Sequence, residues 1–162
     1  MTTAWIGLGA NLGDAVATVR SALAALDRLP GSRRVVTSSL YRSRPLGPAD
    51  QPDYINAVAA LETDLLASDL LSHLQRIEAD HGRIRSGLRW GPRTLDLDIL
   101  LHGDTISSDA RLTLPHPGLC QRPFVLYPLY EVAPQLAIPG HGVVQALLAG
   151  CPPDGLDVIA SA

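Results

Sequence analysis

Apolar and polar residues alternate along residues 95–101. Leucine or isoleucine stands at every odd position of this stretch, and Asp96 and Asp98 stand at even positions. Successive side chains of a β-strand point to opposite faces, so the pattern predicts a strand with one buried face and both carboxylates on the other, about 6.6 Å apart. At an effective dielectric of about 20, two such charges repel by roughly 2.5 kcal/mol. A cation that prefers oxygen ligands, such as magnesium, would reverse the sign of this interaction.

Two other stretches have the period of an amphipathic helix. Apolar residues recur at helical spacing from Asp14 to Leu29, where a Pro-Gly pair ends the pattern. A second helix is predicted from about Ser68, with Gly82 as its C-cap. Apolar and β-branched runs predict further strands at residues 5–8, 35–41, 56–63 and 111–114, and a proline-rich loop at residues 43–53.

The predicted elements follow one another in the order β-α-β-β-α-β, which is that of a ferredoxin-like unit. We therefore predict an α+β fold with a mainly antiparallel sheet and helices packed on it. Extra short strands and a helix are appended after this core. The appended helix is predicted to have Pro128 in its first turn and to end at Pro134.

Composition limits the class of protein. The chain has 162 residues, of which 46% are hydrophobic, and this favours a single domain over residues 1–162. The net charge of −3 argues against general affinity for nucleic acid or anionic membranes. All 13 basic residues are arginine, so the lysine of a GxxxxGK[ST] phosphate loop is lacking. No run approaches a membrane span and no signal peptide is recognisable, so we expect a cytoplasmic protein. We also expect a monomer, although no sequence pattern determines the oligomeric state.

Four arginines lie between His81 and Leu95 without any acidic residue, namely Arg83, Arg85, Arg89 and Arg93. Guanidinium groups bind phosphate oxygens in bidentate fashion and stay charged. A solvated loop would be the simpler interpretation of the arginines alone. Next to the Asp96 strand, however, they predict a nucleoside-triphosphate site that pairs arginine with metal-binding carboxylates.

Other candidate residues have two interpretations each. Tyr54 and Asn56 share a strand face, so they could stack on and hydrogen-bond a flat heterocycle, or be ordinary half-buried strand residues. Gln75 and Glu78 are helix neighbours for which a solvated face is the default. His116 lies between two prolines, where it could contact a phosphate or face solvent.

Three glycines follow or interrupt the first strand. Gly7, Gly9 and Gly13 imitate part of a dinucleotide-binding fingerprint, but the last spacing is one residue too long. No acidic partner follows at the expected distance after a second parallel strand. We therefore interpret the cluster as a tight turn between strand and helix.

These segments together resemble the 6-hydroxymethyl-7,8-dihydropterin pyrophosphokinase family of folate biosynthesis. The resemblance rests on four motifs in the family's order: GLGANLGD at 7–14, SLYRSRPLGPADQPDYINAV at 39–58, RWGPRTLDLDILL at 89–101 and LPHPGLCQRPFVLYPLYEVAP at 114–134. It implies transfer of pyrophosphate from ATP to the hydroxymethyl group of the pterin, with release of AMP and with two magnesium ions. It also implies small-molecule substrates only, without a nucleic-acid or membrane partner.

The resemblance further implies roles for particular residues. Catalysis would depend on Arg83, Arg93, Asp96 and Asp98, and the two aspartates would bind the metal. Contacts to ATP would come from Gln75, Glu78, Arg85, Trp90, Arg93, Ile99, Arg111, Thr113, His116 and Arg122. Contacts to the pterin would come from Ser43, Pro45, Leu46, Tyr54, Asn56, Trp90, Asp96 and Phe124.

A ferredoxin-like module without catalysis is the alternative. An RNA-binding module would carry aromatic residues on its central strands and a basic face, whereas the strand here carries aspartates. A regulatory ligand-binding domain would need neither the aspartate pair nor the arginine loop. Both alternatives therefore rank below the enzyme.

Overall fold

The strand predicted around Asp96 is β5 (Asp96–His102) in a computed structural model that describes residues 1–44, 51–82 and 94–162. Leu97 and Ile99 are buried, whereas Asp96 and Asp98 are partly exposed, as the alternation predicts. β5 pairs with β1 (Thr2–Ala10), and β1 pairs on its other side with β4 (Tyr54–Thr63).

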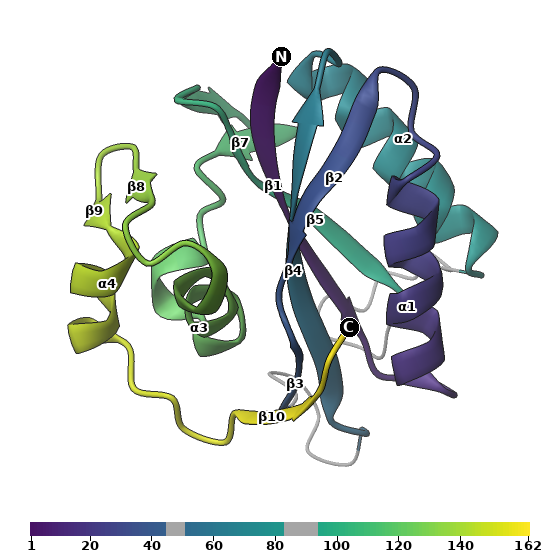
Figure 1. Cartoon of the computed structure of the whole chain (residues 1–162), viewed down its shortest axis with the longest axis vertical. Helices are drawn as coiled ribbons and strands as arrows, with labels where there is room; N and C mark the ends of the chain where they lie inside the picture. Colours follow the sequence, from purple (N-terminus) through teal and green to yellow (C-terminus); the bar gives the residue numbers. More distant parts are fainter. Residues whose placement is uncertain (45–50, 83–93) are drawn as a thin grey trace.

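The main sheet has the ferredoxin-like topology that the sequence predicts. Its strand order is β10-β3-β4-β1-β5, β2 also pairs with β4, and every pairing is antiparallel. Helices α1 (Ala15–Leu26) and α2 (Ala67–Asp80) cover one face of the sheet, and α3 (Pro123–Val132) and α4 (Val144–Leu147) lie on the other (Figure 1).

Each face of the sheet has its own apolar core. Leu26 of α1 and Leu74 of α2 pack in the first core, and Leu126 and Leu129 of α3 pack in the second. These four side chains are fully buried. Burial of a leucine side chain contributes roughly 1.5–3 kcal/mol, so α3 is held to the sheet mainly by apolar contacts.

The first helix starts where the sequence predicts. The Asp14 carboxylate accepts a hydrogen bond from the Ala17 N–H at 3.1 Å and caps α1. Such a cap contributes about 0.5–2 kcal/mol because it satisfies one of the helix's unpaired amides. The helix ends at Leu26, before the predicted Leu29.

The single strand predicted at residues 35–41 is wrong. The structure has two strands, β2 (Ser32–Thr37) and β3 (Leu40–Ser43), which both pair with β4. Ser38 lies between them and is buried. Its N–H donates to the Val58 carbonyl at 2.9 Å, and its hydroxyl accepts from the Val58 N–H at 3.0 Å. The serine hydroxyl therefore takes the place of a backbone acceptor at the break.

The predicted start of the third helix is also wrong. α3 begins at Pro123, whereas Pro128 lies inside the helix. Proline suits the first position because the N–H that it lacks has no partner there. At Pro128 the same lack removes the bond to the Phe124 carbonyl, yet Leu126 and Leu129 keep the helix packed on the sheet.

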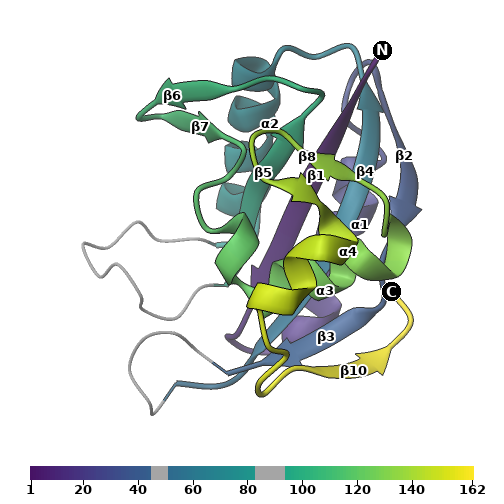
Figure 2. The ribbon, with the colours of Figure 1, turned by 90° about the vertical axis from the view of Figure 1, so that its left-hand side faces the viewer.

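The remaining segments form small elements around this core. A hairpin of β6 (Ser107–Asp109) and β7 (Leu112–Leu114) contains the short extended piece that the sequence predicts, and Figure 2 shows it projecting beside α2. Short 3₁₀ turns cover Leu119–Gln121 and Leu148–Gly150. After Gly140 the sequence has little pattern, but the chain completes the hairpin of β8 (Ala137–Ile138) and β9 (Gly142–Val143) and ends with β10 (Asp157–Ala160), which pairs with β3.

Among the residues described, no helix combines the length and the apolar character needed to cross a bilayer.

Candidate active site

A cleft of about 320 Å³ opens between the sheet and the first turn of α3. Four strands (β1, β3, β4 and β5) contribute side chains to it, together with the segment before α3. The lining residues are Gly7, Leu8, Gly9, Ser43, Arg44, Tyr54, Asn56, Ala57, Asp96, Asp98, Leu100, His116, Pro117, Arg122, Phe124 and Val125.

The floor of the cleft is open because the central strand carries glycine there. Gly9 pairs with Asn56 on one side and with Asp96 on the other, so the three residues form one row across the sheet. A Cβ atom at Gly9 would lie 3.2 Å from Asn56 Nδ2 and 3.8 Å from a ring carbon of Tyr54. Gly7 lies in the next row, beside Asp98. Gly7 and Gly9 lie within strand β1, so the prediction of a tight turn is wrong for them. The prediction is right for Gly13, which follows the strand and has a φ of +62°.

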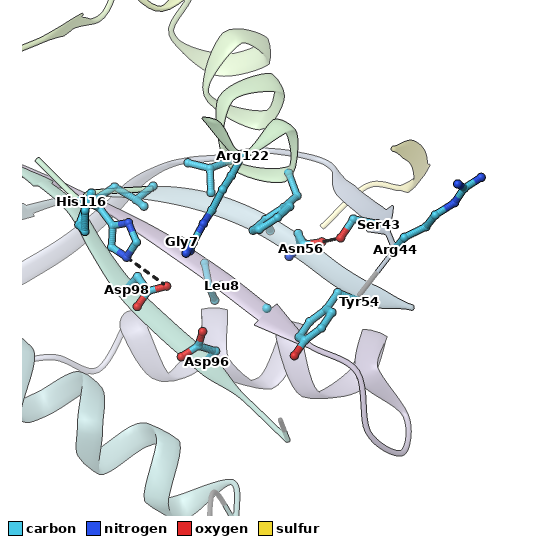
Figure 3. A pocket seen from close by; sticks show the side chains of 16 residues that line it. Gly7, Leu8, Ser43, Arg44, Tyr54, Asn56, Asp96, Asp98, His116 and Arg122 are labelled. Carbon is cyan, nitrogen blue, oxygen red and sulfur yellow. Dashed lines mark hydrogen bonds and ion pairs between the residues drawn. The ribbon is translucent and has the colours of Figure 1, made fainter. Parts of the chain in front are cut away.

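Asp96 and Asp98 project from the same side of β5 into this cleft, as the sequence predicts (Figure 3). His116 faces them, with Nε2 3.9 Å from Asp98 Oδ2. The pKa of His116 is lowered to about 4, first by burial and then by the positive charge of Arg122. The negative charge of Asp96 acts in the opposite direction and raises this pKa, but by less. Since His116 Nδ1 accepts from the Gly118 N–H at 3.1 Å, the neutral ring is assigned its proton on Nε2, toward the carboxylates.

The other end of the cleft presents an oriented amide. The Ser43 hydroxyl donates to Asn56 Oδ1 at 2.6 Å, and both side chains are buried. The bond holds the carbonyl of the amide, so the NH₂ group is directed toward Gly9, in line with the 3.2 Å between Nδ2 and a Cβ atom placed at that residue. Tyr54 lies beside this amide, as Figure 3 shows. An amide next to an aromatic ring suits a flat ligand with a polar edge.

The wall opposite the sheet carries a cation and a second aromatic ring. The Arg122 guanidinium carbon lies 5.9 Å from the centre of the Phe124 ring, within the range of a cation–π interaction. The Arg122 side chain also packs directly on Gly118, where no Cβ atom would fit without moving it. The contact with the Gly118 backbone therefore helps to hold the Arg122 side chain in the cleft.

A second cleft, of about 290 Å³, lies between the start of α2 and the β6–β7 hairpin. Arg111 lines it with Leu71 and Leu112, and its Nη2 donates to the Ser72 hydroxyl at 3.3 Å. Thr113 is in β7 and donates to the Asp109 carbonyl at 3.1 Å.

The structure brings most of the described candidate residues into one place. Those that line the first cleft are Ser43, Tyr54, Asn56, Asp96, Asp98, His116, Arg122 and Phe124. Arg111 lines the second. Neither of these two clefts is lined by Gln75, Glu78, Ile99 or Thr113. Ile99 points into the core beneath α1 and α2.

The default of a solvated face is wrong for Glu78. Its side chain is buried, and it accepts a hydrogen bond from the backbone N–H of Leu97. Sequence reasoning also did not assign the glycine floor to the site. The available signal was the spacing of Gly7 and Gly9, since residues two apart in a strand share a face.

Six candidate residues lie outside the described residues, and their roles stay predictions: Pro45, Leu46, Arg83, Arg85, Trp90 and Arg93.

The fold and the cleft define an α+β protein in which two carboxylates, an arginine and a buried amide beside an aromatic ring line one cleft. The family model described as 7,8-dihydro-6-hydroxymethylpterin-pyrophosphokinase (HPPK) matches residues 5–134. The chain therefore belongs to this family, and the resemblance seen in its motifs is confirmed.

Curated relatives agree with this membership. The chain is 50% identical over 153 residues to the 2-amino-4-hydroxy-6-hydroxymethyldihydropteridine pyrophosphokinase of Pseudomonas aeruginosa. The matched residues cover 94% of this chain and 94% of that protein. It is 50% identical to the enzyme of the same name from Haemophilus influenzae, over 91% of this chain and 92% of that protein.

Solved structures support the fold. The crystal structure of wild-type Plasmodium falciparum HPPK-DHPS matches 92% of this chain with a TM-score of 0.71 and 14% identity. This chain spans 44% of that longer protein, and the likeness at this identity concerns the fold alone.

Proposed function

We propose that this chain transfers pyrophosphate from ATP to the hydroxymethyl group of 6-hydroxymethyl-7,8-dihydropterin and releases AMP. This is the family's step in folate biosynthesis, and the names of the relatives support it. The observation that carries the proposal is the row Asn56–Gly9–Asp96. In this row the oriented Asn56 amide and the Asp96 carboxylate, a group of the kind that binds metal ions, lie two strand spacings apart, about 10 Å. Only Gly9 lies between them.

The acceptor would lie over the glycine floor. The Asn56 amide, oriented by Ser43, would bind the polar edge of the pterin, and Tyr54 and Phe124 would contact its faces. The hydroxymethyl arm would then point along the row toward Asp96. Such alignment of the attacking oxygen with the phosphorus removes much of the entropic cost of the reaction.

Asp96 and Asp98 would hold two magnesium ions. Carboxylate oxygens are the ligands that magnesium prefers, and one or two of them often suffice beside phosphate oxygens and water. Bound there, magnesium would neutralise the phosphates of ATP. The pair fits this role because both side chains leave the same face of β5 into one cleft.

The residues opposite the carboxylates would bind the phosphates. Neutral His116 presents an N–H on Nε2 that can donate to a phosphate oxygen, and Arg122 supplies a permanent positive charge. Arg83, Arg85 and Arg93 are proposed to add charge during the transfer. The protein's work is thus alignment and electrostatic stabilisation.

Arg111 is proposed to contact the nucleoside end of ATP. Arg111 lines the second cleft with two leucines, which suits a base on apolar side chains. The family likeness suggests further contacts to ATP from Gln75, Glu78, Trp90, Ile99 and Thr113. Since the Ile99 side chain is buried in the core, its contact would come from its backbone. The described residues of one chain form both clefts, and we propose that residues 1–162 act as one monomeric, cytoplasmic domain.

The test is to incubate the protein with ATP, magnesium and the hydroxymethyl dihydropterin and to identify the nucleotide product. We expect AMP, formed only when the pterin and magnesium are present. Asp96→Asn and Asp98→Asn should each lower turnover by at least about 100-fold, because each removes a charged metal ligand. Asp104→Asn is the matched control, since Asp104 is an exposed aspartate outside both clefts.

ADP as the product, or full activity in both aspartate variants, would contradict the proposal. A module that only binds its ligand would yield no AMP under any condition, so the same assay separates the enzyme from the alternative.

A further inference from the structure

Glu131, near the end of α3, accepts hydrogen bonds from residues at and just after the break between β2 and β3. The Ser39 N–H is shared by the two carboxylate oxygens at 3.0 and 3.1 Å, and the Ser39 hydroxyl donates at 2.9 Å. The Tyr41 hydroxyl donates to Oε1 at 2.6 Å. A carboxylate on the helix therefore binds three donor groups of Ser39 and Tyr41.

The bond from Tyr41 is short and sheltered. Tyr41 is buried, with 6% of its surface exposed, and its hydroxyl reaches a charged acceptor. Burial, and then the Glu131 carboxylate, raise the pKa of this tyrosine, so the hydroxyl keeps its proton and remains a donor. Hydrogen bonds to charged groups are roughly twice as strong as neutral ones.

Both residues are directly connected to the acceptor half of the cleft. Tyr41 pairs with Asn56 across β3 and β4, and Ser43, two residues further along β3, orients the Asn56 amide. Glu131 is on the same helix as Phe124, which lines the opposite wall. The bond between Tyr41 and Glu131 thus joins the strand wall of the cleft to its helix wall.

The apolar contacts of α3 do not determine the spacing of these walls by themselves. Leu126 and Leu129 hold the helix on the sheet, but hydrophobic attraction is not directional and allows a helix to slide or rotate. Hydrogen bonds have defined lengths and angles. Directional contacts at Glu131 therefore select one position of α3 against β3.

We propose that Tyr41 and Glu131 are positioning residues for the acceptor: their hydrogen bond sets the spacing between Phe124 on α3 and Asn56 on β4. The inference rests on the proposed function, because the spacing matters for a flat ligand between these walls. Neither residue lines the first cleft among the described residues, so both act through their neighbours.

The test compares Tyr41→Phe with Tyr127→Phe. Each variant removes one hydroxyl, and Tyr127 also lies on α3, where its hydroxyl donates to the Cys151 carbonyl at 2.8 Å, away from the acceptor residues. Tyr41→Phe should raise KM for the dihydropterin about fivefold and leave KM for ATP within about twofold. Tyr127→Phe should leave both constants unchanged. Thermal unfolding of both variants measures the general loss of stability.

Glu131→Gln is the second variant, and it should raise the dihydropterin KM in the same direction as Tyr41→Phe. Equal kinetic constants for Tyr41→Phe and Tyr127→Phe would overturn the inference, as would equal increases in the KM values of both substrates. Failure of the proposed function is recognised separately, because the unmodified protein would then form no AMP.

Discussion

The carboxylate of Glu78, on α2, accepts a hydrogen bond from the backbone N–H of Leu97 at 2.9 Å. Leu97 lies between Asp96 and Asp98, and β5 is the last strand in the order of the described sheet. The N–H at this edge is therefore satisfied by a helix side chain instead of another strand. Glu78 is 3% exposed, so the bond forms away from competing water.

Glu78→Met should destabilise the protein by about 1–3 kcal/mol, because a buried N–H then lacks its acceptor. Glu78→Gln keeps an acceptor oxygen at the same length and should cost clearly less. Urea unfolding of the two variants measures the difference in the free energy of unfolding. Equal stability of the Met and Gln variants would show that the Leu97 bond contributes nothing.

Gly9→Ala should impair acceptor binding. The new methyl group would lie 3.2 Å from Asn56 Nδ2 and on the floor of the cleft, so the amide must shift. Overpacking of about 1–2 kcal/mol corresponds to roughly a five- to thirtyfold increase in KM for the dihydropterin. Gly150→Ala is the control, because a methyl group there meets no atom within 4 Å. A normal KM in Gly9→Ala would contradict the role of the glycine floor.

Gly118→Ala should displace Arg122. A Cβ atom at residue 118 would lie 2.6 Å from the Arg122 guanidinium carbon, and the flexible side chain would move more easily than the backbone. We expect kcat/KM for ATP to fall about tenfold, the effect of losing a contact of roughly 1.4 kcal/mol. Gly150→Ala again serves as the control, and thermal unfolding shows whether the fold is kept. An unchanged kcat/KM for ATP would show that Arg122 does not contribute to phosphate binding.

The parts of the fold that depend on neighbouring residues were predictable. The alternation around Asp96 predicts β5, and the helical spacing of apolar residues from Asp14 predicts α1. The break between β2 and β3 was not predictable, because Ser38 bonds to Val58, 20 residues away. Either Pro123 or Pro128 is compatible with a helix start, and the packing of α3 on the sheet decided between them.

The site was predictable in a similar way. The common strand face of Asp96 and Asp98 was predicted from their spacing. For Tyr54 and Asn56 the spacing predicted a shared face, and only the family resemblance assigned them to the site. Glu78 was expected at the surface because helical spacing shows which residues share a face but does not show what packs against it. The end of α2 lies against β5, and that contact buries the carboxylate.

The sequence by itself determined the local periods, the start of the first helix and the pair of carboxylates, because each depends on residues a few positions apart. The tertiary structure alone decided that Asn56, Gly9 and Asp96 form one row and that Glu131 binds Tyr41. These contacts join segments 40 to 90 residues apart, and strand register and helix packing determine which of their atoms meet.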